Sequence, residues 1–340
     1  MKQTKNAIYM LIHSYSSLLT KAFIWGGASL LIINPAFADV KDTIEWSGGV
    51  DSAGNPAGTK DNPLPDPEPD RNPDKKNPYY YTSGTYNKID FNIDRAYGGV
   101  RDTTEAWIVH DKLTVNDNGS VKIVNTVDHS NVDNNGTIRA MSNGIIDFTD
   151  LEQVYLVAVD GKESRNDSTA ITVEGAGKVE VSGKTVQIIG SIDVKDANSE
   201  STVNMTLSGK DSFWYGSVIG DSSTKNSVDV TLKDGASWIF YKSGSLGSSW
   251  FGGGGGRLSN LTLDGGVVIL DEDIIKSRYE STPIVGTDKT LSDYRTDEGK
   301  HSAVNITNLK GAGIFKIDLD WVTNQGKTSY TSNSDFINIT

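Results

Sequence analysis

The sequence predicts an all-β chain that folds as a right-handed parallel β-helix, preceded by a signal peptide and a proline-rich N-terminal segment. Three observations favour this fold class. Short stretches of alternating apolar and polar residues recur through residues 79–340. Turn dipeptides such as Asn118-Gly119 and Asp234-Gly235 separate them. The stretches also repeat at intervals of about 20–30 residues, which is typical of a solenoid, and no helical period of useful length interrupts them.

Composition excludes several classes of function. The 340 residues include no cysteine and only four histidines, so disulfides, thiolate metal sites and a cysteine nucleophile are ruled out. Lys and Arg number 32 against 44 Asp and Glu, a net charge of −12, whereas a nucleic-acid-binding protein carries a basic surface. We therefore expect no cofactor, no metal and no nucleic-acid partner.

Residues 1–38 have the features of a signal peptide. Lys2, Lys5 and Lys21 are their only charged residues, an apolar run follows at Ala22–Ile33, and Ala36-Phe37-Ala38 fits a cleavage site before Asp39. An uncleaved anchor is the alternative, but the run of about 12 residues falls short of the roughly 20 that a spanning helix needs. Cleavage would remove three positive charges and take the net charge from −12 to −15.

Residues 39–78 form a separate segment. One short strand is expected around Thr43–Trp46. Seven of the nine prolines then lie between residues 56 and 78. Because proline lacks an amide donor and fixes φ, this segment is expected to stay outside sheets and helices, as a linker or surface loop.

Residues 79–340 form one repetitive body. Val203–Leu207 and Val228–Leu232 share one pattern at an offset of 25 residues, and Leu261–Leu263 repeats it 31 residues further on. A sandwich or propeller is the competing architecture, but such folds favour hairpins with two-residue turns. Here the spacers vary widely in length, and a solenoid accommodates such insertions as loops, so a solenoid is preferred.

An ordered series of motifs resembles the passenger domains of bacterial autotransporters of the AIDA/pertactin type. Val228–Trp238 matches the pattern v-x-v-x-L-x-x-G-A-x-W, and Leu258–Gly266 matches S-x-L-x-x-L-x-L-x-G-G in part. Leu309–Asp318 and Ser334–Ile337 resemble the conserved stem of that family, so residues 309–340 would be its start. The resemblance implies a β-helical passenger exported by type V secretion from a Gram-negative bacterium.

One departure from the family concerns membrane anchoring. Family members continue into a C-terminal outer-membrane β-barrel, and no series of roughly 10-residue alternating membrane strands is present here. The resemblance therefore implies a β-barrel translocator that is encoded elsewhere or lost, or a truncated passenger fragment.

Candidate catalytic motifs have simpler structural explanations. Gly220-Asp221-Ser222 is similar to a serine-protease motif, but the next residue is Ser223 and no base or orienting acid is evident. Asp271 and Asp273 are a possible carboxylate pair, expected instead to lie at the start of a solvated insertion loop. Gly252–Gly256 precedes Arg257 rather than the Lys-Ser of a phosphate-binding loop. No catalytic residue is assigned.

Aromatic residues are the candidate ligand contacts. Alternation places Trp214 on one face of its strand and Tyr215 on the other, so some rings are expected outside the core. Trp250 and Phe251 precede the glycine run. Exposed aromatic rings suit sugar or protein contacts, and the alternative is that these rings stack within the core.

The sequence therefore predicts a non-enzymatic surface adhesin or structural spacer that acts through many weak contacts. A secreted carbohydrate-active enzyme on the same fold and a non-functional fragment are the alternatives. Expected partners are a host-cell protein or glycan, or another bacterial surface. Export through the Sec pathway would place the chain at the cell surface or outside the cell, or in the periplasm if the translocator is missing.

Overall fold

The computed structural model describes residues 41–47, 49–50, 56–57, 84–94, 104–127, 135–160, 168–195, 199–220, 225–240, 257–279, 281–284, 290, 303–317 and 336–339. The chain divides into two units, residues 1–38 and 39–340, and every described residue belongs to the second. The predicted signal peptide and its cleavage site at Ala38–Asp39 lie outside the described residues.

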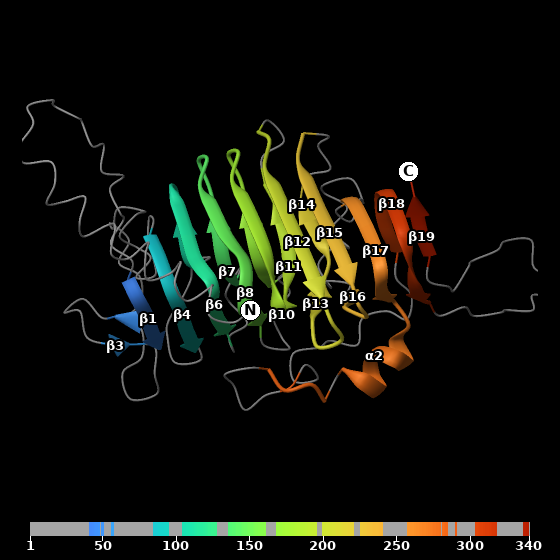
Figure 1. The fold of residues 1–340 in the computed structure, drawn as a ribbon, viewed down its shortest axis with the longest axis horizontal. Coiled ribbons are helices and arrows are strands. Elements are labelled where there is room, and N and C mark those ends of the chain that lie inside the picture. The colour runs from blue at the N-terminus through green and yellow to red at the C-terminus, as the bar shows by residue number, and fades with distance from the viewer. Residues whose placement is uncertain are drawn as a thin grey trace, which may run out of the picture. The chain divides into compact units, whose positions relative to one another are not determined.

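The second unit is built mainly from β-strands, so the all-β prediction is confirmed (Figure 1). The largest sheet has twelve strands: β1 (Lys41–Ser47), β4 (Gly84–Asp94), β6 (Lys112–Val127), β8 (Ile145–Asp160), β10 (Lys178–Ile189), β12 (Thr202–Ser208), β13 (Phe213–Gly216), β15 (Ser227–Lys233), β16 (Ser237–Phe240), β17 (Arg257–Ile269), β18 (Ala303–Lys316) and β19 (Phe336–Ile339). A second sheet has five: β5 (Thr104–Val109), β7 (Asn135–Ala140), β9 (Thr169–Val173), β11 (Ser191–Val194) and β14 (Val218–Gly220).

A two-stranded antiparallel sheet precedes these strands. It pairs β2 (Gly49–Val50) with β3 (Pro56–Ala57). The expectation that the proline-rich segment stays outside any sheet is therefore wrong at Pro56. Proline is tolerated at the first residue of an edge strand, because the missing amide donor there breaks no ladder.

Neighbouring strands of the large sheet pair in parallel. Val121 of β6 pairs with Val154 of β8, which pairs with Val186 of β10. A parallel pair needs a connection that returns to the same end of the sheet. From β4 to β15, each connection contains one strand of the five-stranded sheet. We call a strand of the large sheet, together with the small-sheet strand that follows it, a strand unit.

Two strands can replace one long strand of the large sheet. The first half of β10 pairs with β12, and its second half pairs with β13. Gly209, at φ +82°, lies in the turn that separates these two strands and adopts the left-handed backbone that glycine favours. The predicted repeat is confirmed, because Leu207 pairs with Leu232 and Leu232 with Leu263.

The core lies between the two sheets and is almost entirely apolar. Alternate residues of each strand point into it, as in the pattern of β15, where Val228, Val230 and Leu232 are buried and their neighbours are not. Trp107 of the small sheet stacks on Phe91 of the large one at a centroid distance of 5.1 Å. Such contacts join the sheets into one cluster.

One row of residues paired in register runs across the large sheet from β1 to β18. We call it the aromatic row, and its register is given by successive strand pairs: Trp46, Phe91, Ile123, Leu156, Ile188, Trp214, Trp238, Val268 and Phe315. Trp214 and Trp238 are fully buried and stack at 4.9 Å with 6° between their planes. Their Nε1 atoms donate to the carbonyl oxygens of Gly190 (3.0 Å) and Gly216 (2.9 Å).

A second apolar cluster lies outside this core. Its strand members are Val124, Val157, Val159, Ile189, Phe213, Tyr215, Ile239 and Ile269, and Ile275 and Ile284 join them. Ile275 belongs to α2 (Glu272–Arg278), a helix where the sequence predicts a solvated loop. That prediction is wrong, because Asp271 caps the helix and the outer sheet face offers Ile275 an apolar surface to cover.

Candidate functional site

A polar cluster lies on the outer face of the five-stranded sheet. Arg139, Thr172 and Asp193 are paired in register across β7, β9 and β11. Each stands between two core residues of its strand, so alternation directs it outward. The flanking core residues are Ile138, Ala140, Ile171, Val173, Ile192 and Val194.

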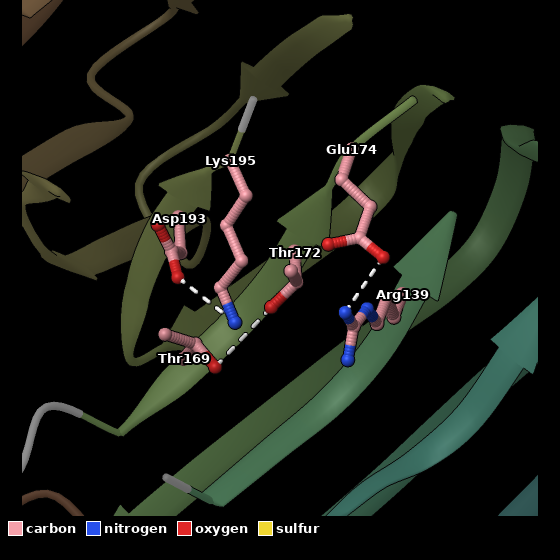
Figure 2. A network of polar contacts seen from close by, with 6 residues as sticks. All are labelled: Arg139, Thr169, Thr172, Glu174, Asp193 and Lys195. Carbon is pink, nitrogen blue, oxygen red and sulfur yellow. Dashed lines mark hydrogen bonds and ion pairs between the residues drawn. The ribbon is translucent and has the colours of Figure 1, made fainter. Parts of the chain in front are cut away.

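Two ion pairs and a hydroxyl contact build this cluster (Figure 2). A terminal guanidinium nitrogen of Arg139 lies 2.6 Å from a carboxylate oxygen of Glu174. Nζ of Lys195 lies 3.4 Å from the carboxylate of Asp193. The Thr172 hydroxyl contacts that of Thr169 at 3.4 Å. We call these six residues the polar cluster.

The polar cluster is partly desolvated. The side chains of Arg139 and Glu174 are 21% and 19% exposed, and both threonines are buried. Charge-assisted hydrogen bonds are stronger than neutral ones when water is partly excluded. The cluster therefore presents two cations and two carboxylates in a fixed pattern.

Each carboxylate of the cluster is paired with a cation, so the four charged groups form two ion pairs. No group of three or more His, Asp or Glu side chains among the described residues could hold a metal ion. Paired donors and acceptors of both charges can hydrogen-bond a neutral polyhydroxyl ligand or a zwitterionic peptide surface.

A second polar surface follows the first halves of the long strands. Asp229, Asn260 and Asn308 are paired in register on β15, β17 and β18. The Asn260 amide donates to Asp229 (2.6 Å), and the Asn308 amide donates to Asn260 (3.0 Å). Thr206, Thr231 and Thr262 form a parallel row two residues further on. The threonine row repeats the same hydroxyl group at the spacing of neighbouring strands, about 4.8 Å.

Charged and aromatic side chains also lie on the outer face of the large sheet, in the second halves of its long strands. Lys122 of β6 pairs in register with Tyr155 of β8 and forms an ion pair with Asp90 of β4 (3.0 Å). Burial raises the pKa of Tyr155 above its usual value of 10.0, and the negative charge of Asp211 raises it further.

The structure separates the candidate aromatic contacts. Trp214 lies in the core with its ring against Trp238, while Tyr215 faces the opposite side, as the alternation predicts. Tyr215 is nevertheless buried in the outer apolar cluster, beside Phe213. Trp250 and Phe251 lie outside the described residues, as do Gly252–Gly256.

The two candidate catalytic sequences also have structural placements. Gly220 ends β14, and Asp221 and Ser222 lie outside the described residues. Asp271 accepts a hydrogen bond from the backbone amide of Ile274 (3.0 Å), which is the contact of a helix cap. Asp273 is exposed in the first turn of α2.

The polar cluster is the set of residues that sequence reasoning misses. Arg139 and Glu174 are 35 positions apart, and no local motif joins them. The available signal is a single charged residue between two apolar ones, as in Ile138-Arg139-Ala140 and Ile192-Asp193-Val194. That signal marks outward positions but gives no partner until the strand register is known.

Comparison with known proteins adds no relative. No protein-family model matches the chain, and no curated protein or solved structure matches it. Within the described ranges, no helix is both long enough and apolar enough to cross a membrane.

Proposed function

We propose that the two sheets form the faces of a right-handed parallel β-helix, in which each strand unit is one coil. From β4 to β15 the chain returns to the small sheet once between successive passes along the large sheet, and neighbouring coils pair in parallel. Right-handed crossovers between parallel strands are the rule in proteins, which favours that hand here.

We propose further that the chain is an exported, non-enzymatic surface adhesin or structural spacer of the autotransporter-passenger type. The strongest support is the register that continues through successive strand pairs from β1 to β18. Stability then comes from contacts between neighbouring units, so that the outer faces are available for binding. Repeated polar rows on one face allow many weak contacts to a partner to add up.

The resemblance of Val228–Trp238 and Leu309–Asp318 to passenger motifs supports the same function. On this proposal residues 1–38 direct export through the Sec pathway, and a β-barrel translocator brings the chain to the cell surface. The binding partner would be a glycan or protein on a host cell or on another bacterium, met through the polar cluster and the polar rows.

Export is tested first, with the native gene and its neighbouring reading frame. Cells are fractionated, and the N-terminus and mass of the product are determined. A product that begins at Asp39 on the cell surface or in the medium is the expected result. A product that keeps residues 1–38 in the cytoplasm would refute export, and one that is degraded in the periplasm would refute surface display.

Adhesion is tested with the purified chain on glycan arrays and on intact cells. Arg139→Ala and Lys195→Ala together remove both cations of the polar cluster and are expected to weaken binding at least about tenfold. Lys184→Ala is the matched control, because it breaks an ion pair with Glu152 that lies outside the cluster. Equal binding by the two variants would exclude the polar cluster as the contact surface.

A further inference from the structure

Polar side chains surround one aromatic ring on the outer face of the large sheet. Tyr155 of β8 pairs in register with Lys122 of β6 on one side and with Gln187 of β10 on the other. Gln153 precedes Tyr155 by two residues on β8, so alternation directs it to the same face. Asp211 lies in the turn before β13 and completes the group. We call these five residues the Tyr155 platform.

Contacts within and beside the platform hold its side chains in place. Nζ of Lys122 lies 3.0 Å from the carboxylate of Asp90. The Gln187 amide donates to the backbone carbonyl of Asp211 at 3.1 Å. Burial raises the pKa of Tyr155, and the carboxylate of Asp211 raises it further, so this carboxylate is close enough for its charge to act on the Tyr155 hydroxyl. Because these groups are positioned in advance, a ligand would lose little affinity to ordering them.

The platform is accessible from solvent. Gln153 and Asp211 are exposed, and Lys122, Tyr155 and Gln187 are partly exposed. The register row that contains Tyr155 becomes apolar at Phe213, which is buried. The ring of Tyr279, which follows α2, lies 6.4 Å from that of Phe213. The α2 segment therefore borders the platform on its β13 side.

The platform and the ion pairs beside it carry no net formal charge. Lys88 and Lys122 both contact Asp90, at 3.4 Å and 3.0 Å, and Asp211 supplies the second carboxylate. Two cations and two carboxylates cancel, whereas the whole chain has a net charge of −12. An uncharged ligand meets no local repulsion here, and the field of the whole chain opposes an anionic one.

We infer that the Tyr155 platform binds the pyranose ring of a neutral saccharide. A pyranose has an apolar face of C–H bonds and a rim of hydroxyl groups that both donate and accept hydrogen bonds. Tyr155 supplies an aromatic ring for the apolar face. Lysine and amide nitrogens donate to the rim, and amide and carboxylate oxygens accept from it. These groups stand about 4.8 Å apart across strands and about 6.7 Å apart along one strand, so several can reach one sugar ring.

This inference deepens the proposed adhesin function, because it names a ligand class and a site separate from the polar cluster. It rests on the proposed function for its biological role alone. Saccharide binding is measured on the purified chain and export is measured in cells, so the failure of one is distinguishable from the failure of the other.

The first test is saturation-transfer NMR of the purified chain with a panel of simple sugars. The neutral probes are methyl β-D-glucopyranoside, methyl β-D-galactopyranoside, methyl α-D-mannopyranoside and N-acetylglucosamine. Glucuronic acid is the charged counterpart of glucose. At least one neutral probe is expected to bind with a dissociation constant on the order of millimolar. Glucuronic acid is expected to bind at least about fivefold more weakly, because of the net negative charge of the chain.

Substitutions then locate the binding. Tyr155→Ala removes the ring and is expected to weaken binding at least about tenfold, whereas Tyr155→Phe keeps the ring and is expected to stay within about threefold. Gln187→Ala is expected to weaken binding about three- to tenfold. Glu180→Ala is the matched control, because Glu180 is an exposed residue in the first half of the same strand, and no change is expected.

A direct observation of Tyr155 needs only the conservative variant. In a chain with ¹³C-labelled tyrosine, the signal of Tyr155 is the one that Tyr155→Phe removes. It is expected to shift as the bound glycoside is added, while the signal of Tyr215, which is buried in the outer apolar cluster, stays in place.

Four results would overturn the inference. The first is that no neutral probe binds, and the second is that glucuronic acid binds more tightly than the neutral glucoside. The third is binding that Tyr155→Ala and Glu180→Ala weaken equally. The fourth is a bound glycoside that leaves the Tyr155 signal unmoved, which would place the saccharide elsewhere on the chain.

Discussion

Replacing Trp238 by alanine tests the packing of the aromatic row. Trp238 is fully buried, its ring stacks on Trp214 at 4.9 Å, and its Nε1 donates to the Gly216 carbonyl at 2.9 Å. Truncating a buried tryptophan removes apolar contacts and leaves a cavity, at a cost of about 3–5 kcal/mol. Loss of the stacked pair adds about 0.5–1.5 kcal/mol. We expect Trp238→Ala to lower the free energy of unfolding by about 3.5–6.5 kcal/mol.

Trp238→Phe separates the ring from the hydrogen bond. Phenylalanine keeps an aromatic ring against Trp214 but leaves the buried Gly216 carbonyl without its donor. We expect a cost of about 1–2 kcal/mol, mainly from that carbonyl. Urea unfolding followed by far-ultraviolet circular dichroism gives both values, with the slope m compared among variants to detect any change in the unfolded or folded state.

A small effect of Trp238→Ala would refute this description of the core. If the unfolding free energy falls by less than about 1 kcal/mol, the Trp214–Trp238 stack is not closely packed. A cost for Trp238→Phe equal to that for Trp238→Ala would instead assign the whole effect to the hydrogen bond and none to the ring.

Three further predictions concern the outer faces. Because the pKa of Tyr155 is raised in the folded chain, this tyrosine ionises at lower pH in the unfolded chain than in the folded one. The contribution of Tyr155 to the free energy of unfolding is therefore complete below pH 10 and is lost as pH rises through the folded-state pKa. Tyr155→Phe should flatten that alkaline loss in urea unfolding, and Asp211→Asn should lower the pKa of Tyr155 measured by NMR. Asp271→Ala removes the cap of α2 and should cost about 1 kcal/mol, visible as faster amide exchange in α2 but not in the sheets. Arg139→Ala should cost about 1–2 kcal/mol, and a double-mutant cycle with Glu174→Ala that shows no coupling would contradict the ion pair.

The strands of the large sheet could be predicted because each carries its own signal. Alternation in Val228–Leu232 gives the strand and its buried face without reference to any other segment. The offset of 25 residues to Leu207 then gives the pairing, and the structure has the same register. Inward positions repeat because each one must fill the same core space as its neighbour.

The helix α2 could not be predicted from its own sequence. It spans Glu272–Arg278, just under two helical turns, and only Ile274 and Ile275 are apolar. The helix packs on an apolar outer surface that includes Ile239 and Ile269. Alternation marks both residues as outward, so the sequence pattern alone would predict that they face solvent. A short helix of this kind is stabilised by tertiary packing, which the local pattern does not contain.

The polar cluster could not be predicted from the sequence for a related reason. Arg139 and Glu174 meet because two connections of different length bring β7 and β9 into one register. Chain length between strands does not determine that register, so the sequence marks the outward positions without naming their partners.

The register also allows the chain to vary in length between strands. Leu207 and Leu232 are 25 positions apart, Leu232 and Leu263 are 31 apart, and Leu263 and Gly311 are 48 apart, yet each pair is in register. Doubling the length of a loop adds only about 0.6 kcal/mol to the free-energy cost of closing it. New segments can therefore be gained, lost or exchanged at these junctions during evolution while the ladder is inherited intact. The same junctions are the natural places to graft a foreign epitope or an affinity tag.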